Sequence, residues 1–407
     1  MPIDRESANR VAFGQLSSAE PVLIDVRRAL DVVPGMKPNL IITSGAPLRW
    51  EEYDGLHRMG ILYGAVHEGL ASSLEEADRK LAAGEIEVES GHDHACIGPG
   101  TAICTASMSV FVVENRTGGN RAFCTFYEGD SQNRLNWGAY GPDTVANFKF
   151  IEEVVAPVLG DAIRRLGGIP LRPIIERALR LGDELHLRAT AAGLLCAAAM
   201  FPALIEVARE RDSDVKRTLA FLERTRQFWF MRPLIAASKA ATDAAHGVEG
   251  SSLITAMTMN CKGFALRVSG LGDDWFCGPH PELGHLLPEG MKTDEVTNPG
   301  GDCVVVEVVG LGAFAQVAAF PNSSSAAKRT GALYDITLGE HPAFKLASFA
   351  NRGTPVGIDV FRVLETGVQP PLTGFVASSR GPLVVLPVAP LESFRAAAEA
   401  YQRRYRD

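Results

Sequence analysis

The sequence lacks long apolar runs and any excess of basic residues. Its longest apolar run, 191–201, is shorter than the roughly 18–20 residues that cross a bilayer. Its polar start, MPIDRESANR, has no apolar core of the kind found in secretory signals. The net charge is −8 and the basic residues are dispersed, so the broad positive field that nucleic-acid binding needs is missing. We therefore expect a cytoplasmic protein that binds neither membranes nor nucleic acid.

Cysteine motifs and common nucleotide or hydrolase motifs are also missing. The seven cysteines include no Cys-x-x-Cys pair, and their wide spacing is unlike that of zinc ribbons or disulfide-stapled folds. There is no phosphate-binding P-loop and no G-x-S-x-G nucleophile motif. We expect reduced, mostly buried thiols, and neither a resident metal nor a cofactor.

The composition is that of a globular protein, with 46% hydrophobic and 22% charged residues. A length of 407 residues exceeds what one core usually organises, so we expect two or three domains. Residues 1–146 alternate β-rich runs with amphipathic stretches, residues 147–246 read as amphipathic helices, and strands return in residues 247–407. The predicted fold is a multi-domain α+β or α/β fold, with a helical middle domain between two mixed domains.

The individual elements follow from the same patterns. Strands are expected at 21–26, 39–45, 108–115, 264–270, 302–310, 333–339, 356–367 and 381–390. Helices are expected at 56–71, 74–83, 147–166, 171–188, 190–210, 213–231, 233–246 and 391–405.

The first candidate site is the segment 112–129, in which a buried strand leads into a glycine pair flanked by arginines. Arginine presents a planar fork of donors that suits carboxylate or phosphate, and a glycine pair lets backbone N–H groups turn toward the same anion. Substrate binding is accordingly assigned to Glu114, Asn115, Arg116, Asn120 and Arg121. The equally weighted alternative is a surface hairpin whose arginines pair with Glu114 and Glu128.

The second candidate site is the segment 243–260, where a glycine-flanked turn leads through two serines into a predicted helix. Unpaired N–H groups and the helix dipole make such a start suitable for an anion. Gly250, Ser251 and Ser252 are therefore predicted to bind substrate, while His246 handles a proton and Glu249 orients it. The alternative is ordinary helix capping.

Three further histidines are candidate substrate ligands. His92 and His94, two positions apart, would share one face of a strand, a spacing that zinc ligands also use. No third metal ligand can be nominated from the sequence, so hydrogen bonding to substrate is favoured over a metal. His186 follows two acidic residues and is either a substrate contact or the end of a helix.

One glycine motif is similar to a dinucleotide-binding fingerprint. Gly310, Gly312 and Ala315 follow a predicted strand with the spacing G-x-G-x-x-A. The helix expected after them is short, and no second strand ends in an acidic residue about 20 residues later. An NAD-linked oxidoreductase is therefore kept as a minority alternative.

Seven longer motifs together resemble one protein family. They are VVPGM (32–36), VVENRTGGNRAFCT (112–125), GDELHLR (182–188), AAHGVEGSSLITAM (244–257), RVSGLG (267–272), GLGAFA (310–315) and RGTPVGIDV (352–360). In this order they resemble the YlbE-like family from about residue 21 to residue 394. The resemblance implies an α+β fold with a helical insert. It also implies a role as the AllG-type subunit of the FdrA-associated oxamate carbamoyltransferase of anaerobic allantoin breakdown.

The resemblance further implies that carbamoyl phosphate and oxamate exchange with oxalurate and phosphate. Both substrates are small, anionic and rich in hydrogen-bond acceptors, which suits arginines and backbone donors. An FdrA-like protein is the implied partner, and we expect a homo-oligomer. Two main functions stay open: a carbamoyl-transfer enzyme or enzyme subunit, and a non-catalytic scaffold for the FdrA-like partner.

Overall fold

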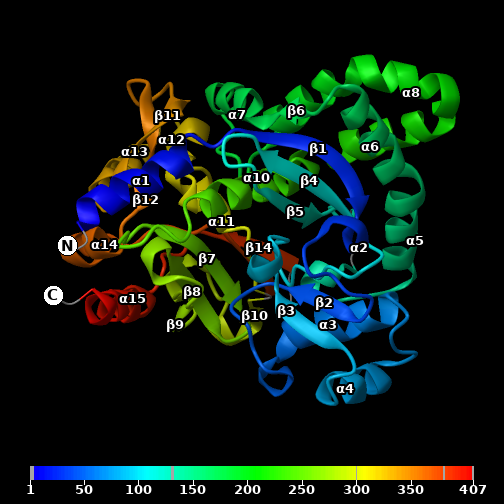
Figure 1. Cartoon of the computed structure of the whole chain (residues 1–407), viewed down its shortest axis with the longest axis horizontal. Coiled ribbons are helices and arrows are strands. Elements are labelled where there is room, and N and C mark those ends of the chain that lie inside the picture. Colours follow the sequence, from blue (N-terminus) through cyan, green and yellow to red (C-terminus); the bar gives the residue numbers. More distant parts are fainter. Residues whose placement is uncertain (1–3, 130–132, 299, 379–380, 406–407) are drawn as a thin grey trace.

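The computed structural model describes residues 4–129, 133–298, 300–378 and 381–405. Within them the chain forms several small sheets and many helices, and both ends of the chain lie on the same side of the molecule (Figure 1). The structure confirms the predicted α+β class.

The N-terminal sheet has the strand order β5-β4-β1-β6. Its strands are β1 (Pro21–Arg28), β4 (Ser109–Asn115), β5 (Arg121–Thr125) and β6 (Ile169–Pro170). Strand β4 pairs antiparallel with both β1 and β5. Helix α6 (Ala156–Arg165) packs against β1, and α10 (Met231–Ala244) packs against β4 and β5. The apolar runs at 21–26 and 108–115 thus form strands, as predicted.

A small parallel sheet lies beside the first one, at the lower right of Figure 1. It contains β2 (Leu40–Thr43) and β3 (Glu87–Ser90), which are connected through α3 (Gly55–His67) and α4 (Leu74–Ala82). The Ser73 hydroxyl accepts a hydrogen bond from the Glu76 backbone N–H at 3.2 Å, which starts α4 where the sequence predicts it. The remaining N-terminal helices are α1 (Arg5–Ser17) and α2 (Ala29–Val32).

The middle of the chain is helical, as predicted. Its elements are α5 (Pro142–Phe150), a π-helical turn (Ile151–Val155), α6, α7 (Leu171–Arg180), α8 (Thr190–Arg224), α9 (Arg226–Trp229) and α10. Helix α8 is kinked at Arg211, where φ is −139° and ψ is 48°. The two helices predicted at 190–210 and 213–231 therefore meet at a kink without an intervening loop.

Helix α8 is long and apolar enough, by length and composition alone, to cross a membrane. The sequence-based expectation counted only the uninterrupted run 191–201, whereas the helix continues well beyond it. Buried helices of water-soluble folds meet the same criterion. One side of α8 is in fact buried through Met200, Leu204 and Val207, and the helix packs against α6 and α7.

The C-terminal part forms three further small sheets. Their strands are β7 (Ile254–Asn260), β8 (Gly263–Val268) and β9 (Phe276–Gly278); β11 (Thr337–Leu346) and β12 (Arg352–Ile358); and β10 (Val296–Thr297), β13 (Gly374–Ser378) and β14 (Gly381–Val385). The helices are α11 (Val305–Val308), α12 (Gln316–Ala319), α13 (Ser324–Ile336), α14 (Val360–Thr366) and α15 (Leu391–Arg404). Helix α15 confirms the helix predicted to close the chain.

Three strand predictions in this part are wrong in whole or in part. Segment 302–310 contains the short helix α11, after which Gly310 adopts a φ of 80°. A buried run of β-branched residues does not by itself distinguish a strand from a buried helix, and here packing overrides β-propensity. Segments 333–339 and 356–367 are helix–strand junctions, α13 to β11 and β12 to α14. The glycine motif at 310–315 therefore lacks the preceding strand that a dinucleotide fingerprint requires.

The largest apolar core draws on all three predicted domains, for example through Leu23, Leu204 and Val306. Smaller cores lie around α3 and around β7 and β8. The helical segment is thus packed into the rest of the molecule. The division at 1–146, 147–246 and 247–407 stays a prediction.

Glu152, in the π-helical turn, gives a testable pH effect. One of its carboxylate oxygens is buried and has no hydrogen-bond partner among the described residues. Burial, helped by the charges of Glu68 and Glu153, raises the pKa of Glu152 from 4.5 to about 7. The folded state therefore holds a proton that the unfolded chain releases, and its stability falls as the pH rises from 4.5 to about 7.

We expect Glu152→Gln to stabilise the protein at pH 8 by on the order of 1 kcal/mol, a figure reduced for the partial exposure of this side chain. At pH 4 the carboxyl is protonated in both states, so the variant should melt at the wild-type temperature. Thermal unfolding at the two pH values measures the difference. An equal shift at both would mean that the change acts through packing instead of ionisation.

Candidate functional site

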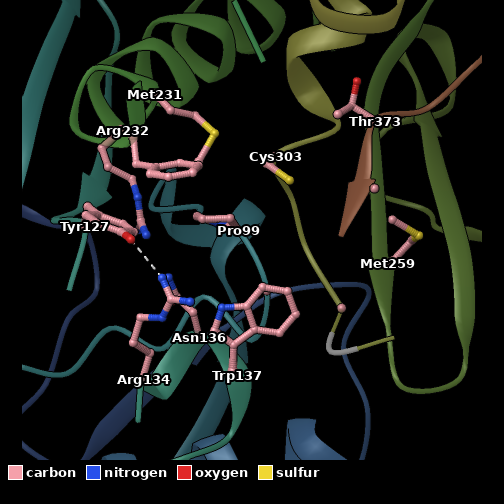
Figure 2. Close-up of a pocket in the computed structure, with 14 residues that line it drawn as sticks. Pro99, Tyr127, Arg134, Asn136, Trp137, Met231, Arg232, Met259, Cys303 and Thr373 are labelled. Carbon is pink, nitrogen blue, oxygen red and sulfur yellow. Dashed lines mark hydrogen bonds between the residues drawn. The ribbon is translucent and has the colours of Figure 1, made fainter. Parts of the chain in front are cut away.

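A cavity of about 260 Å³ lies where the N-terminal sheet, the helical segment and the C-terminal loops meet (Figure 2). The residues that line it are Pro99, Gly100, Tyr127, Arg134, Asn136, Trp137, Phe228, Met231, Arg232, Met259, Gly300, Cys303, Thr373 and Gly374. Gly100 and Gly300 have φ values of 62° and 93°, and a Cβ on either would collide with neighbouring atoms. Glycine at these two turns lets the backbone approach the cavity closely.

Two arginines form one side of this cavity. Arg232, at the start of α10, is only 1% exposed, and Arg134 is partly buried beside it (Figure 2). Nη1 of Arg134 donates to the Tyr127 hydroxyl at 2.8 Å. In both arginines Nε is buried without a hydrogen-bond partner, and neither guanidinium forms an ion pair with a described Asp or Glu. Two cations without carboxylate partners make this an anion-binding environment.

Glu128 is the acidic residue that acts on Arg232. It is buried, and it accepts backbone hydrogen bonds from Leu135 at 2.6 Å and Asn136 at 3.0 Å. With its amide oriented to satisfy both neighbours, the Asn136 side chain donates to Glu128 and accepts from Nη2 of Arg232 at 2.7 Å. Burial raises the pKa of Glu128, although the backbone hydrogen bond from Asn136 and the charge of Arg232 oppose the shift. Glu128 thus reaches Arg232 through the Asn136 amide and makes no direct ion pair with the guanidinium.

Thr373 and Met259 lie on the other side of the cavity from the arginines (Figure 2). The Thr373 backbone N–H donates to Glu307 at 3.2 Å, while its hydroxyl is buried without a hydrogen-bond partner among the described residues. A buried hydroxyl without a partner beside a cavity can donate or accept a further hydrogen bond.

Asp302 fixes the loops that form the cavity. Its carboxylate is fully buried and accepts from the Gly45 backbone N–H at 2.9 Å and from the Thr258 hydroxyl at 2.5 Å. Its backbone N–H donates to the Gly98 carbonyl at 2.9 Å. One aspartate thereby ties two N-terminal loops to strand β7 directly beside the cavity.

A second, larger cavity of about 610 Å³ contains three of the predicted site residues, His92, His94 and His246. Nδ1 of His246 bonds to Thr255 at 2.7 Å, and its Nε2 bonds to Asp273 at 3.3 Å, so Asp273 rather than the exposed Glu249 is its acidic partner. Burial lowers the pKa of His246 and of His92, which favours neutral imidazoles. The sequence thus selected side chains that do share one cavity.

His92 and His94 do not lie on a strand as predicted. They belong to a 3-10 turn, Gly91–His94, and His94 is tied to the Pro34 carbonyl and to Glu89, each at 2.7 Å. Because the segment turns here, the two histidines do not lie on one face of an extended strand. Within the part of the chain that the structure describes, no group of three or more His, Cys, Asp or Glu residues is arranged to hold a metal ion.

The cations of the second cavity are already neutralised. Lys239 pairs with Asp243 at 2.6 Å, and Arg267 pairs with Asp93 at 2.7 Å. Because the arginines of the first cavity lack such partners, we regard the first cavity as the stronger candidate for an anionic substrate.

The predicted arginine cluster at 112–129 forms a surface hairpin instead of a pocket. Arg121 is paired across the strands with Glu114 at 2.7 Å, and exposed Arg116 donates to the Gly167 carbonyl at 3.2 Å. Asn115 and Asn120 bond to each other at 3.1 Å, and Asn120 also donates to the Ala240 carbonyl. None of these five residues lines either cavity.

We expect Arg116→Ala and Arg121→Ala to change anion binding by less than about twofold, because exposed ion pairs contribute about 0–1 kcal/mol and are screened by salt. Calorimetric titration of each variant with a small anionic substrate gives the measurement. A loss of tenfold or more would place the anion at the hairpin.

The predicted serine helix start is wrong, because Ser251 and Ser252 lead into strand β7. Both serines are fully buried and bond to Asn9, and Ser252 also donates to Asp359 at 2.5 Å. The Gly250 N–H donates to the Tyr405 hydroxyl. Their hydrogen-bonding groups are thus used to join α1 and the C-terminal helices to β7.

His186 is buried beside Glu307, with Nδ1 of the imidazole 2.9 Å from the carboxylate. It lies directly behind the first cavity, since Glu307 also accepts from the Thr373 backbone. Sequence reasoning found this histidine but missed Arg134, Arg232 and Cys303. The available signal was weak: Arg232 stands in an apolar helix before Pro233, where a charged residue needs a buried partner or ligand.

Comparison with known proteins gives matches over nearly the whole chain. A family model described as oxamate carbamoyltransferase subunit AllG matches residues 86–303. YahG of Escherichia coli K12 is 33% identical over 381 residues, covering 91% of this chain and 79% of that protein. The oxamate carbamoyltransferase subunit AllG of the same organism is 30% identical over 407 residues, covering 97% and 96%.

A solved structure matches the fold as well. It is the crystal structure of a conserved protein of unknown function from Enterococcus faecalis V583, with a TM-score of 0.91 and 30% sequence identity. The match covers 98% of each chain, so the whole arrangement of sheets and helices is shared.

Proposed function

The chain belongs to the oxamate carbamoyltransferase subunit AllG family, and from this membership we propose that it binds and transfers a carbamoyl group in its arginine-lined cavity. The substrates would be of the carbamoyl phosphate and oxamate class, that is, small anions carrying an amide or ureido group. The coarser statement, a carbamoyltransferase subunit, rests on the family; the substrates and the site are our proposal.

The observation that carries the proposal is the pair of arginines without carboxylate partners. A volume of about 260 Å³ lies below the roughly 300–1,000 Å³ of pockets for drug-sized ligands, so it suits a small substrate. Arg232 and Arg134 would hold the anionic group, and Thr373 and the glycine turns would bond to the amide. Transfer between two bound substrates is accelerated by such positioning and by donors placed where charge develops.

The assay measures phosphate release from carbamoyl phosphate plus oxamate, by the chain alone and with an FdrA-like partner protein. A catalytic chain gives acceptor-dependent release and is stabilised against heat by its substrates. If the partner releases phosphate without this chain, and the substrates do not stabilise this chain against heat, the chain is a non-catalytic scaffold instead. Stabilisation by millimolar nicotinamide cofactor alone would favour an oxidoreductase.

Assembly with a partner subunit is the second part of the proposal. Three large apolar side chains of α8, Leu194, Phe201 and Ile205, are each at least half exposed, and their spacing places them on one side of the helix. The subunit name of the family supports a protein partner. The seven free cysteines support a reducing compartment, so we propose a cytoplasmic location.

We expect the double substitution Phe201→Ser and Ile205→Glu to weaken association with an FdrA-like partner by at least about tenfold, since it removes apolar area that the partner would bury. Sedimentation of mixtures measures the association. Glu206→Gln, on the same helix, is the matched control. Unchanged association of the double variant would exclude this surface.

A further inference from the structure

We propose that Cys303 is a nucleophile that carries the carbamoyl group covalently, with His186 as its base and Glu307 as the residue that positions the histidine. The inference rests on the proposed function and deepens it, because it replaces direct transfer between two substrates by two successive steps through the protein. Any carbamoyl donor with an anionic leaving group could supply the first step.

Cys303 occupies the right place for such a role. It lines the arginine-containing cavity (Figure 2), directly follows Asp302, and stands just before helix α11. The residue is 6% exposed, so its thiol faces the cavity and little bulk water. Two other residues that line the same cavity have unused hydrogen-bonding groups: the Nε atom of buried Arg232 and the hydroxyl of buried Thr373 have no hydrogen-bond partners among the described residues.

His186 supplies a base next to this thiol. Its Nδ1 is 2.9 Å from Oε1 of Glu307, which fixes the ring and leaves Nε2 to act. Nε2 is buried and makes no hydrogen bond within the described structure, and the Cys303 side chain lies near enough to this imidazole to help raise its pKa. Such contacts are often loose before substrate binds. Burial alone would lower the pKa of His186, but Glu307 and Cys303 outweigh it and raise that pKa well above its usual value.

Glu307 is held rigidly enough to position the imidazole. Its Oε1 also accepts from the backbone N–H groups of Ala313 at 3.1 Å and Thr373 at 3.2 Å. Gly312 has a φ of 59°, and a Cβ there would collide with the same carboxylate. The glycine of the GLGAFA motif therefore makes room for a carboxylate, which gives this motif a role unrelated to dinucleotides. Nucleophile, base and orienting acid are the arrangement of known covalent-transfer sites.

The carbamoyl group is transferred in two steps. His186 takes the Cys303 proton, the sulfur attacks the carbamoyl carbon, the C–O bond to the leaving group breaks, and the leaving anion receives the proton from His186. An S-carbamoyl cysteine remains. The acceptor amide nitrogen then attacks the same carbon, its proton passes to His186, the C–S bond breaks, and the thiolate regains the proton. No electron donor or acceptor is required.

Peptide mass spectrometry tests the intermediate. The complete protein, with its partner if activity needs one, is incubated with carbamoyl phosphate without acceptor. We expect one carbamoyl group on Cys303, and its loss when oxamate is added. Because carbamoyl phosphate also releases cyanate, a cyanate-only sample is run in parallel, and exposed Cys277 reports non-enzymatic labelling in both. Equal labelling of Cys277 and Cys303, insensitive to oxamate, would overturn the proposal.

Turnover of Cys303→Ala should fall by on the order of 10³-fold or more, whereas Cys196→Ala, the same change at a buried cysteine outside the cavity, should retain wild-type turnover. Full activity of Cys303→Ala would remove the covalent step while leaving the carbamoyl-transfer function intact.

Alkylation by iodoacetamide tests thiol activation without any turnover. Glu307→Gln and His186→Gln should slow the alkylation of Cys303 at pH 7 and shift its pH profile, while Cys277 should react at an unchanged rate in every folded variant. If wild-type Cys303 reacts no faster than in these variants, the proposed triad is wrong even if the protein transfers carbamoyl groups.

Discussion

Replacing Arg232 with glutamine will raise the KM for the anionic carbamoyl donor by about 10- to 150-fold, because a charge-assisted hydrogen bond contributes about 1.5–3 kcal/mol. The effect is large because this residue is 1% exposed and its guanidinium makes no direct ion pair with a described Asp or Glu, so little solvent screens its charge. Arg134→Gln should act in the same direction but less strongly, since Arg134 is only partly buried.

Arg232→Lys separates charge from geometry. Lysine keeps the positive charge but loses the planar donor fork and the bond to Asn136, so an intermediate KM is expected. Arg121→Gln, at the surface hairpin, is the matched control and should leave KM unchanged. Thermal unfolding identifies a variant that has merely lost stability. A folded Arg232→Gln protein with wild-type KM would show that the anion binds elsewhere, and the second cavity would be the next place to look.

The sequence predicts much of this fold because amphipathic periodicity reports burial directly. The strands at 21–26 and 108–115 and most of the helical segment 147–246 form where the pattern indicates, but the helix predicted at 171–188 ends at Arg180, so His186 lies in a loop and does not end a helix. It fails at 302–310, where Val304 to Val309 are buried on all sides. A segment buried on every face has no periodicity, so only the contacts around it decide between helix and strand.

The candidate site is harder to derive from the sequence. The pattern indicated an anion site with two arginines, and it selected Arg116 and Arg121 because they flank a glycine pair. In the structure that glycine pair is simply the turn of a hairpin, and the arginines of the cavity come from 134 and 232, about a hundred residues apart. The packing of α10 against the N-terminal sheet brings these two arginines together, and a local sequence motif does not encode that packing.

The second large effect is expected from Asp302→Ala, which should destabilise the protein by about 2–5 kcal/mol because buried donors left without an acceptor cost about 1–3 kcal/mol each. The Gly45 N–H and the Thr258 hydroxyl would both lose their acceptor. Asp302→Asn keeps the shape of the side chain and one acceptor oxygen, so it should lose less stability. Asp212→Ala removes an exposed i, i+4 pair with Lys216 and should change stability by no more than about 0.5 kcal/mol.

Urea unfolding of the three variants measures these differences in stability. Stabilisation by substrate, measured on the same samples, shows whether the cavity still binds its ligand. Because the Asp302 carboxylate joins an N-terminal loop to β7 beside Cys303 and Gly300, losing it should separate the walls of the cavity before the whole chain unfolds. Asp302→Ala should therefore lose binding at denaturant concentrations where its helices are still intact by circular dichroism. If binding and helicity were lost together at the wild-type midpoint, Asp302 would be neither a structural tie nor a support for the site.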